Sequence, residues 1–399
     1  MKTGTDRLAD DPRLASRLPD RGFALLAHPA SVTADLEHVS ALLARLNRRP
    51  RVILGPEHGY GGEAQDMIGV TDARDLHGTP IRSLYGAELS DLSPRPEDLE
   101  GCELVVIDLQ DVGSRYYTFV WTAVLVLRVA AKLGVPTLVL DRPNPLGKAQ
   151  REGRSLDPRF RSFVGLEPVP VRHGLTLGEV CAWRAEVEGL PEGALTIVPC
   201  ERVDDAATAR DWDRPFVMTS PNMPTSETAL VYPGGCLLEG TNLSDGRGTT
   251  RPFELTGAPW VDGERLARGL HATGLPGFRA RPVTFQPTFH KHAGQLCGGV
   301  QVHVTDARAF RPYATYLALV ALAQQAHPEH FRFRTERYEF VDDIPAFDLL
   351  TGRDEARARI LAGDEPRAIA EAESALGPDD HATVALAERA AKARHVRLA

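Results

Sequence analysis

The sequence lacks several features that would assign it to common protein classes. Its five cysteines lie far apart with no C-x-x-C pair, which predicts reduced core thiols and not a disulfide framework or a zinc knuckle. No run approaches the roughly 18 apolar residues of a membrane-spanning helix. The first 20 residues are charged and lack the apolar stretch of a secretory signal. We therefore expect a cytoplasmic protein.

Sequence signatures of cofactor binding and of serine hydrolases are missing as well. The chain has no G-x-x-x-x-G-K-[ST] phosphate loop, no G-x-G-x-x-G dinucleotide motif and no G-x-S-x-G nucleophile elbow. The His-Lys-His stretch at 290–292 places no third metal ligand by its spacing, and we interpret it as a solvated strand end. We expect neither a cofactor nor a metal.

The charge is moderate and of mixed sign. A net charge of -8, with acidic and basic residues interspersed, argues against nucleic-acid or anionic-membrane partners. The length of 399 residues exceeds that of a usual single-core domain, so we expect two domains. The oligomeric state cannot be read from these features.

Apolar bursts alternate with helical stretches through the first half of the chain. Runs of Val, Ile and Leu at 51–54, 102–109 and 137–140 predict strands buried on both faces, and 121–134 predicts a helix. This alternation is typical of an α/β fold with a mostly parallel sheet. From about Met218 the chain becomes rich in Gly, Pro, Thr and Asn with little helical periodicity, which predicts a long ordered loop.

Later segments suggest a second unit. Residues 297–306 alternate like a strand, and helices are expected at 313–328, 357–363 and 382–396. We place the domain boundary near residue 225. The expected domains are therefore 20–225 and a smaller α+β unit at 226–399.

Polar turns follow three of the predicted strands. Because the carboxyl ends of parallel strands share one edge of a sheet, we expect these turns to meet at a polar-ligand site. Their candidate side chains are Glu57 and His58 in the first turn, Asp108, Gln110, Asp111 and Arg115 in the second, and Asp141, Arg142 and Asn144 in the third. The alternative for each is structural: a solvated turn, a helix cap or an internal ion pair. Tyr116 and Tyr117 similarly suit either core packing or sugar stacking.

Two further segments add candidates. Arg172 and His173 precede a helix whose start, Thr176 with Glu179, fits a capping box, and both lie outside that box. The segment 237–254 carries Glu239, Asn242, Asp245, Arg247 and Glu254 among glycines that permit close backbone approach to a ligand. A polar cleft of this kind suits carbohydrate hydrolysis, and equally the binding of an acidic ligand.

Several long strings resemble the NamZ-type exo-β-N-acetylmuramidases, a family formerly catalogued as a domain of unknown function. The matching segments occur in family order and are GPEHGYGGEAQD, IRSLYG, IDLQDVGSRYYTF, DRPNPLG, SFVGLEPVPVRHGLTLGEV, the stretch from SPNMPTSE to LTGAPW, and FDLLTG. The resemblance implies a Rossmann-like N-terminal domain, a smaller C-terminal domain and a cleft between them. It also implies release of terminal N-acetylmuramic acid from peptidoglycan-derived glycans.

The resemblance places the family's glutamate on Glu57 as general acid/base, with the substrate's own 2-acetamido group attacking the anomeric carbon. Such substrate-assisted enzymes need a second carboxylate only to orient that group, and Asp108, Asp111 and Glu239 are the candidates. The lactyl carboxylate of muramic acid calls for a cation, from Arg142, Arg172 or Arg247. Asn144, Asn222 and Asn242 are candidates for sugar hydroxyls. A non-catalytic binder of acidic amino sugars and a lactyl esterase or etherase remain alternatives.

Overall fold

The computed structural model describes residues 1–64, 73–75 and 78–397. Gln65 and Asp66, which end the first family-like string, lie outside this range.

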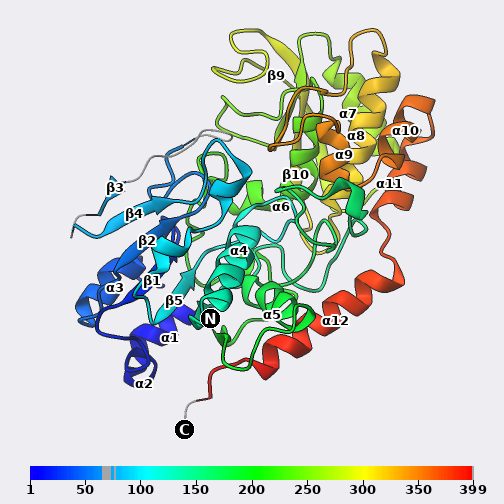
Figure 1. Ribbon diagram of the computed structural model, residues 1–399. Helices are drawn as coiled ribbons and strands as arrows, with labels where there is room; N and C mark the ends of the chain where they lie inside the picture. The colour runs from blue at the N-terminus through cyan, green and yellow to red at the C-terminus, as the bar shows by residue number, and fades with distance from the viewer. Residues whose placement is uncertain (65–72, 76–77, 398–399) are drawn as a thin grey trace.

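A seven-stranded sheet organises the N-terminal half (Figure 1). Its strands are β1 Phe23–Ala27, β2 Val52–Gly55, β3 Ala73–Arg74, β4 Pro80–Ser83, β5 Leu104–Asp108, β6 Thr137–Leu140 and β7 Leu195–Val198, in the order β3-β4-β2-β1-β5-β6-β7. All neighbouring pairs are parallel except β3 with β4. The predicted α/β fold with a mostly parallel sheet is confirmed.

The two faces of this sheet pack against different helices because side chains alternate along a strand. From β1, Phe23 and Leu25 join the core that includes α1 Gly4–Asp10 and α3 Val39–Arg45. Ala24 and Leu26 join the opposite core with α4 Phe119–Lys132 and α5 Leu177–Val187. Burial on both sides explains why the strand sequences are continuously apolar.

Strand order reverses at β1, which lies between β2 and β5. The chain therefore leaves the carboxyl ends of these strands toward opposite sides, which opens the crevice where doubly wound sheets bind ligands. The turn after β2 and the segment between β5 and α4 both start at this edge. These are two of the polar turns that the sequence singles out.

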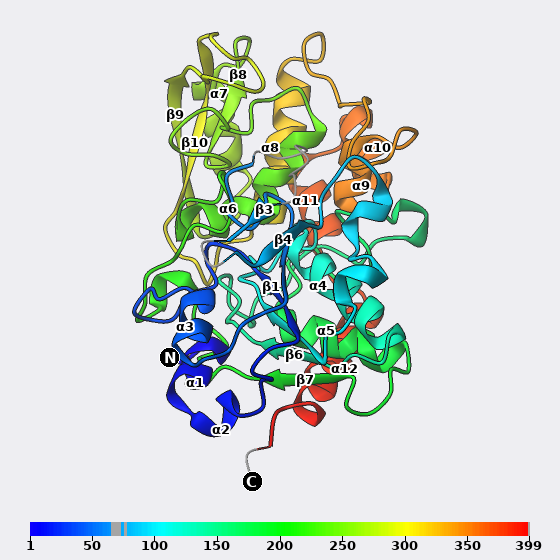
Figure 2. The ribbon, with the colours of Figure 1, turned by 60° about the vertical axis from the view of Figure 1, so that its left-hand side comes forward.

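The C-terminal half carries a smaller antiparallel sheet, shown at the top of Figures 1 and 2. Its order is β8-β10-β9, from β8 Leu255–Ala258, β9 Phe278–Phe285 and β10 Cys297–Val304. The helices here are α6 Ser226–Gly235, α7 Gly263–Ala272, α8 Pro312–Ala326, α9 Ala346–Thr351, α10 Glu355–Ala362 and α11 Pro366–Ser374. The predicted helices at 313–328 and 357–363 are confirmed as α8 and α10.

The expectation of a long loop after Met218 is partly wrong. Helix α6 begins at Ser226 and continues into the 3-10 helix η5 Cys236–Gly240. Its residues from Thr228 to Gly235 are all buried, so no polar face marks the helical period, and Pro233 and two glycines further disguise it.

The last helix crosses the expected domain boundary. Helix α12 Pro378–Ala393 packs against α5 in the N-terminal half, and Ile197 of β7 donates its backbone N–H to Arg394 O just beyond the helix. Figure 1 shows α12 running along the lower edge of the molecule, away from the small sheet. A boundary near residue 225 stays a prediction, and α12 is the part of the expected second domain that packs against α5 of the first.

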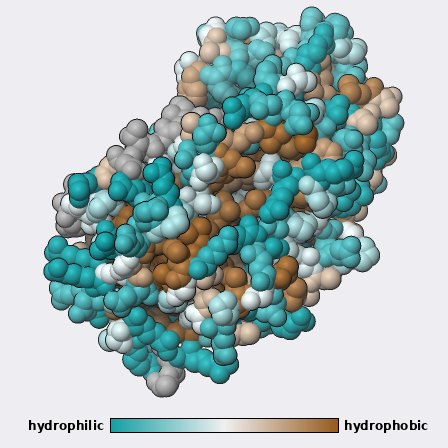
Figure 3. All heavy atoms as spheres, viewed as in Figure 1, coloured by the Kyte–Doolittle hydropathy of each residue, from teal (hydrophilic) through white to brown (hydrophobic). Residues whose placement is uncertain are grey.

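The visible face in Figure 3 is mostly hydrophilic, with hydrophobic residues gathered across its middle. Within residues 1–64, 73–75 and 78–397, no helix combines the length and apolar character needed to span a bilayer.

Candidate active site

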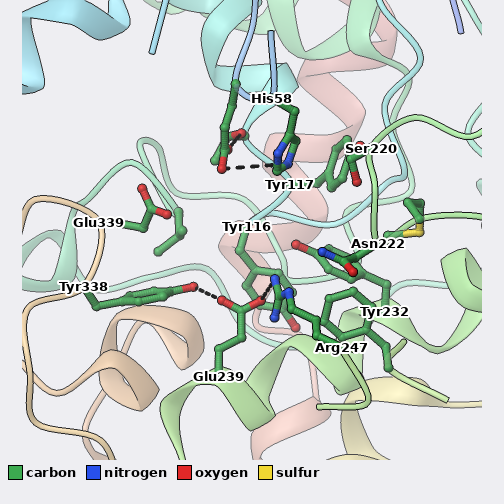
Figure 4. A pocket seen from close by; sticks show the side chains of 15 residues that line it. His58, Tyr116, Tyr117, Ser220, Asn222, Tyr232, Glu239, Arg247, Tyr338 and Glu339 are labelled. Atoms are coloured by element: carbon green, nitrogen blue, oxygen red, sulfur yellow. Dashed lines mark hydrogen bonds and ion pairs between the residues drawn. The ribbon is translucent and has the colours of Figure 1, made fainter. Parts of the chain in front are cut away.

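A pocket lies where the carboxyl edge of the large sheet faces the C-terminal half (Figure 4). Both halves of the chain contribute polar and aromatic side chains to it. Its lining consists of Glu57, His58, Tyr116, Tyr117, Thr118, Val164, Ser220, Asn222, Met223, Tyr232, Glu239, Arg247, Phe253, Tyr338 and Glu339. Seven residues that the sequence nominates are thereby brought together: Glu57, His58, Tyr116, Tyr117, Asn222, Glu239 and Arg247.

Glu57 stands in the turn after β2 and is almost fully buried. Thr118, immediately before α4, donates its hydroxyl to Glu57 Oε2. His58 Nε2 lies 3.8 Å from Glu57 Oε1, and His58 Nδ1 is 2.8 Å from Ala64 O. Because a carbonyl oxygen only accepts, His58 donates from Nδ1 to Ala64 O, and its Nε2 faces the Glu57 carboxyl group.

The backbone of this turn is held in an uncommon conformation. His58 has φ 68°, in the left-handed region that is costly for a residue with a Cβ atom. Such strained positions concentrate at functional sites, where the surrounding structure holds them. The turn conformation that places Glu57 at the pocket is therefore locally strained.

Glu239 enters from η5 on the opposite wall (Figure 4). Arg247 Nη2 donates to its Oε1 over 2.7 Å, and Tyr338 donates its hydroxyl to Oε2 over 2.6 Å. Burial, together with the charge of Glu239, raises the pKa of Tyr338 well above its usual value, so the phenol stays a donor. Donors on both oxygens, with Cys236 Sγ as a third at 3.5 Å from Oε1, hold this side chain in one orientation.

Space next to Glu239 is tightly restricted. Gly240 packs so closely that a Cβ atom at this position would lie 2.6 Å from the backbone N and Cα of Phe347 in α9. The glycine after Glu239 thus allows η5 to approach α9 and sets the position of the carboxylate.

A third glutamate, Glu339, joins the pocket from the segment between α8 and α9. Tyr85 donates its hydroxyl to Glu339 Oε2 over 3.2 Å, which links the two halves of the chain. Glu339 and the next residue, Phe340, have φ values of 46° and 70°. Two consecutive non-glycine residues thus adopt the left-handed region, which costs backbone free energy. The sequence interpretation missed Glu339 because it lies in no Gly-rich turn and follows no strand of the large sheet.

Aromatic residues form part of the pocket lining. Tyr116 donates its hydroxyl to Pro233 O in α6, and Tyr117 donates to Thr219 Oγ1 over 2.7 Å. The rings of Tyr117 and Tyr232 meet edge to face at 5.7 Å. These tyrosines combine core packing with pocket lining, and stacking of a sugar on Tyr116 or Tyr117 stays a prediction. Asn222 and Ser220 face the same space (Figure 4).

Asp108 and Arg142 do not line this pocket but bind each other. Arg142 donates from Nε to Asp108 Oδ1 over 2.5 Å and from Nη2 to Oδ2 over 3.1 Å, and both residues are buried. Thr5 of α1 also donates to Asp108. The polar turns do meet at one edge, as expected, yet these two charges satisfy each other there.

Other predicted residues of the second and third turns have structural partners. Gln110 donates to the carbonyl oxygens of Asp111 and Pro143, and Asn144 donates to Leu175 O. Asp111 Oδ2 accepts from Gly113 N over 2.7 Å and lies 3.5 Å from His173 Nε2. Gln110, Asp111, Asn144 and His173 are buried outside the pocket lining.

Arg115 and Arg172 are fully buried, and their guanidinium groups serve backbone carbonyls. Arg115 donates to Arg154 O, Val169 O and Leu350 O, whereas Arg172 donates to Phe310 O and Leu146 O. Burial lowers the pKa of Arg172 to about 10. Their contacts stabilise the loops around the sheet edge and do not reach the pocket.

Asn242 and the His-Lys-His stretch also differ from expectation. The Asn242 side chain bonds the backbone of His330 and Arg332. Residues 290–292 lie in the loop between β9 and β10 and not at a solvated strand end, because Lys291 turns inward to Leu238 O and Leu243 O. Within the described part of the chain, no group of three His, Cys, Asp or Glu side chains is placed to hold a metal ion.

The local prediction at α5 is confirmed. Thr176 Oγ1 accepts from Glu179 N, and Glu179 Oε2 accepts from Thr176 N, which is the reciprocal capping box. Asp141 accepts from Gly178 N of the same helix and from the Thr176 hydroxyl.

Comparison with known proteins assigns this chain to a family. The N-terminal family model of exo-β-N-acetylmuramidase NamZ matches residues 23–227, and the C-terminal model matches residues 230–375. The peptidoglycan β-N-acetylmuramidase NamZ of Bacillus subtilis strain 168 is 38% identical over 366 residues, which cover 91% of this chain and 85% of that protein.

Two crystal structures of DUF1343 family proteins from Bacteroides fragilis share the fold. One superposes with a TM-score of 0.83 at 26% identity and covers 100% of this chain and 99% of the other. The second has a TM-score of 0.68 at 24% identity and covers 98% of both chains. With matches along nearly its whole length, the chain belongs to the NamZ family of exo-β-N-acetylmuramidases.

Proposed function

We propose that the pocket hydrolyses the glycosidic bond of a terminal β-linked N-acetylmuramic acid residue in peptidoglycan-derived saccharides. The observation that carries this proposal is the meeting of Glu57 with Glu239 and Glu339 in one buried pocket of a chain in the NamZ family. Glu57 supplies the proton that the departing sugar oxygen needs, and later removes a proton from the attacking water.

In this mechanism the acetamido carbonyl oxygen of the substrate attacks C1 while Glu57 protonates the leaving oxygen. The C1–O bond to the aglycon breaks and an oxazolinium ring forms. Water, deprotonated by Glu57, then opens that ring at C1 and gives the free sugar with retained configuration.

We assign the orienting role toward the acetamido group to Glu239. Asp108 and Asp111 face other partners, whereas Glu239 lines the pocket with both oxygens fixed by Arg247 and Tyr338. Its ionised form can accept the acetamido N–H and strengthen the carbonyl oxygen as a nucleophile. Glu339 is the competing assignment.

The lactyl carboxylate is assigned to Arg247. Of the three arginines that the sequence nominates, Arg247 lines the pocket, whereas Arg142 and Arg172 bond partners outside the pocket lining. A guanidinium suits a carboxylate because its N–H groups match the two oxygens.

A product assay tests the function and separates the alternatives. The protein is incubated with the disaccharide MurNAc-GlcNAc and with an aryl β-N-acetylmuraminide, and the products are identified by mass spectrometry. We expect free MurNAc from both. Lactate release would favour an esterase or etherase, and calorimetric binding without turnover would favour a binding protein.

A transition-state mimic separates Glu239 from Glu339. We expect Glu239→Gln to weaken binding of a MurNAc-derived thiazoline, which resembles the oxazolinium ring, more than binding of MurNAc itself. The same preferential loss in Glu339→Gln, without it in Glu239→Gln, would transfer the orienting role to Glu339.

A further inference from the structure

Arg247 and its two nearest charged partners, Glu239 and Asp245, carry a net negative charge, which is unfavourable for binding an anionic substrate. Its Nη2 donates to Glu239 over 2.7 Å, and its Nη1 donates to Asp245 Oδ2 over 3.0 Å. One guanidinium thus serves two buried carboxylates, which leaves a net negative charge beside the pocket. An anionic sugar entering such a site would meet repulsion that is strong at low dielectric.

Lys291 supplies a second cation behind this pair. Its ammonium nitrogen lies 3.4 Å from Asp245 Oδ2 and donates to Leu238 O over 2.7 Å and to Leu243 O over 3.1 Å. Burial alone would raise the pKa of Asp245, but Lys291 and Arg247 outweigh it and hold that pKa well below its usual value. Asp245 therefore favours its ionised form, with Lys291 and Arg247 as its main counter-charges. Burial lowers the pKa of Lys291, and the charges of Asp245 and Glu239 oppose that shift.

The backbone of the loop that carries Lys291 is held so that the ammonium group of the lysine points inward. The flanking residues His290 and His292 have φ values of 67° and 57°, a costly conformation on both sides of the lysine. His292 Nε2 lies 2.7 Å from Asn242 O, and Thr288 donates its backbone N–H and hydroxyl to Gly248 O. These bonds fasten the loop onto the segment that contains Asp245 and Arg247.

His290 is the other basic group at Asp245, with Nδ1 3.6 Å from Oδ1. Its imidazole is more exposed than the Lys291 side chain. Lys291 is absent from the pocket lining, so its effect on a bound sugar passes through Asp245 and Arg247.

We propose that Lys291 is a positioning residue that balances the charge of Asp245 and so lets Arg247 bind the carboxylate of the substrate. This inference rests on the proposed function, because it concerns the anionic group of muramic acid. The chemistry recognised is an acidic sugar, and Lys291 contributes to specificity without touching it. The ammonium also fixes the backbone of the 238–243 segment from which Glu239 projects.

A pair of substrates separates charge from structure. Kinetics are measured with an aryl β-N-acetylmuraminide and with its uncharged lactyl amide, for wild type, Lys291→Met and Lys291→Arg. We expect Lys291→Met to raise KM for the charged substrate about tenfold or more, with a much smaller change for the amide. Lys291→Arg keeps the charge and should restore most of the affinity.

A double variant keeps the test decisive if Lys291→Met folds poorly. Asp245→Asn combined with Lys291→Met removes one charge of each sign, so we expect KM for the charged substrate to return toward the wild-type value. His292→Gln is the control within the same loop, since it leaves the lysine and the aspartate in place. It should change both substrates equally and slightly.

Three results would overturn the inference: an equal loss on both substrates in Lys291→Met, no loss on either, or a double variant that remains selectively impaired for the charged substrate. Failure of the proposed function gives a different result, because wild-type protein would then hydrolyse neither substrate.

Discussion

Asp108 and Arg142 form a buried, two-point ion pair at the carboxyl edge of the large sheet, with Nε–Oδ1 and Nη2–Oδ2 distances of 2.5 and 3.1 Å. Both have the sequence features of site residues: each lies at the carboxyl end of a buried strand, and each is charged. The pair instead joins the last residue of β5 to the turn after β6, outside the pocket lining. Its role is to fix the sheet edge on which the pocket is built.

The first prediction follows from this pair. Asp108→Asn leaves Arg142 buried without its counter-charge, so we expect the free energy of unfolding to fall by about 3–5 kcal/mol. Urea denaturation measures this loss. The folded fraction should keep nearly wild-type turnover, and a stable but inactive Asp108→Asn protein would contradict the structural role.

The second prediction concerns the general acid. Glu57→Gln retains an oxygen to accept from Thr118 but has no proton to give, so we expect kcat on MurNAc-GlcNAc to fall about 10²–10⁴-fold. An activated aryl leaving group needs little protonation, and the loss on that substrate should be smaller. Near-wild-type turnover of the disaccharide would remove Glu57 from the acid role.

The third prediction addresses the orientation of Glu239. Tyr338→Phe removes the hydroxyl that donates to Glu239 Oε2 over 2.6 Å and leaves the ring in place. We expect kcat to fall by about tenfold, because a charge-assisted hydrogen bond is worth roughly 1.5–3 kcal/mol. Steady-state kinetics and a thermal melt are measured together. Unchanged kcat with a lowered melting temperature would show that the tyrosine only stabilises the fold.

The fourth prediction is a dependence of stability on pH. Burial raises the pKa of Asp141 from 3.8 to about 7, against hydrogen bonds from Thr176 and Gly178. Between these values the folded protein holds a proton that the unfolded chain releases, so the free energy of unfolding falls as pH rises. The stabilisation is complete below pH 3.8 and is lost as pH approaches 7, with a total of roughly 4 kcal/mol.

Asp141→Asn tests this dependence because asparagine carries no titrating proton. Urea denaturation at several pH values between 4 and 8 should give a flatter profile for the variant than for wild type. Parallel profiles would show that Asp141 does not titrate in this range.

The fold was largely readable because it depends on repeating patterns. Apolar runs such as 104–107 must be buried on both faces, and helices such as α4 and α8 show long uninterrupted stretches that no other element satisfies. Helix α6 was not predicted, because its residues from Thr228 to Gly235 are all buried and its sequence therefore shows no polar face. Helix α12 was predicted as a helix, but its packing against α5 follows from distant contacts that no local pattern records.

The sequence by itself determined the parallel sheet, the family-like strings and the turn that carries Glu57. Only the tertiary structure decided which charged residues face the pocket, because a charge at a strand end is satisfied either by a ligand or by another side chain. Asp108 and Arg142 satisfy each other, Arg115 and Arg172 serve backbone carbonyls, and Glu339 arrives from a segment with no motif. Burial forces every charge to find a partner, and the identity of that partner depends on three-dimensional proximity.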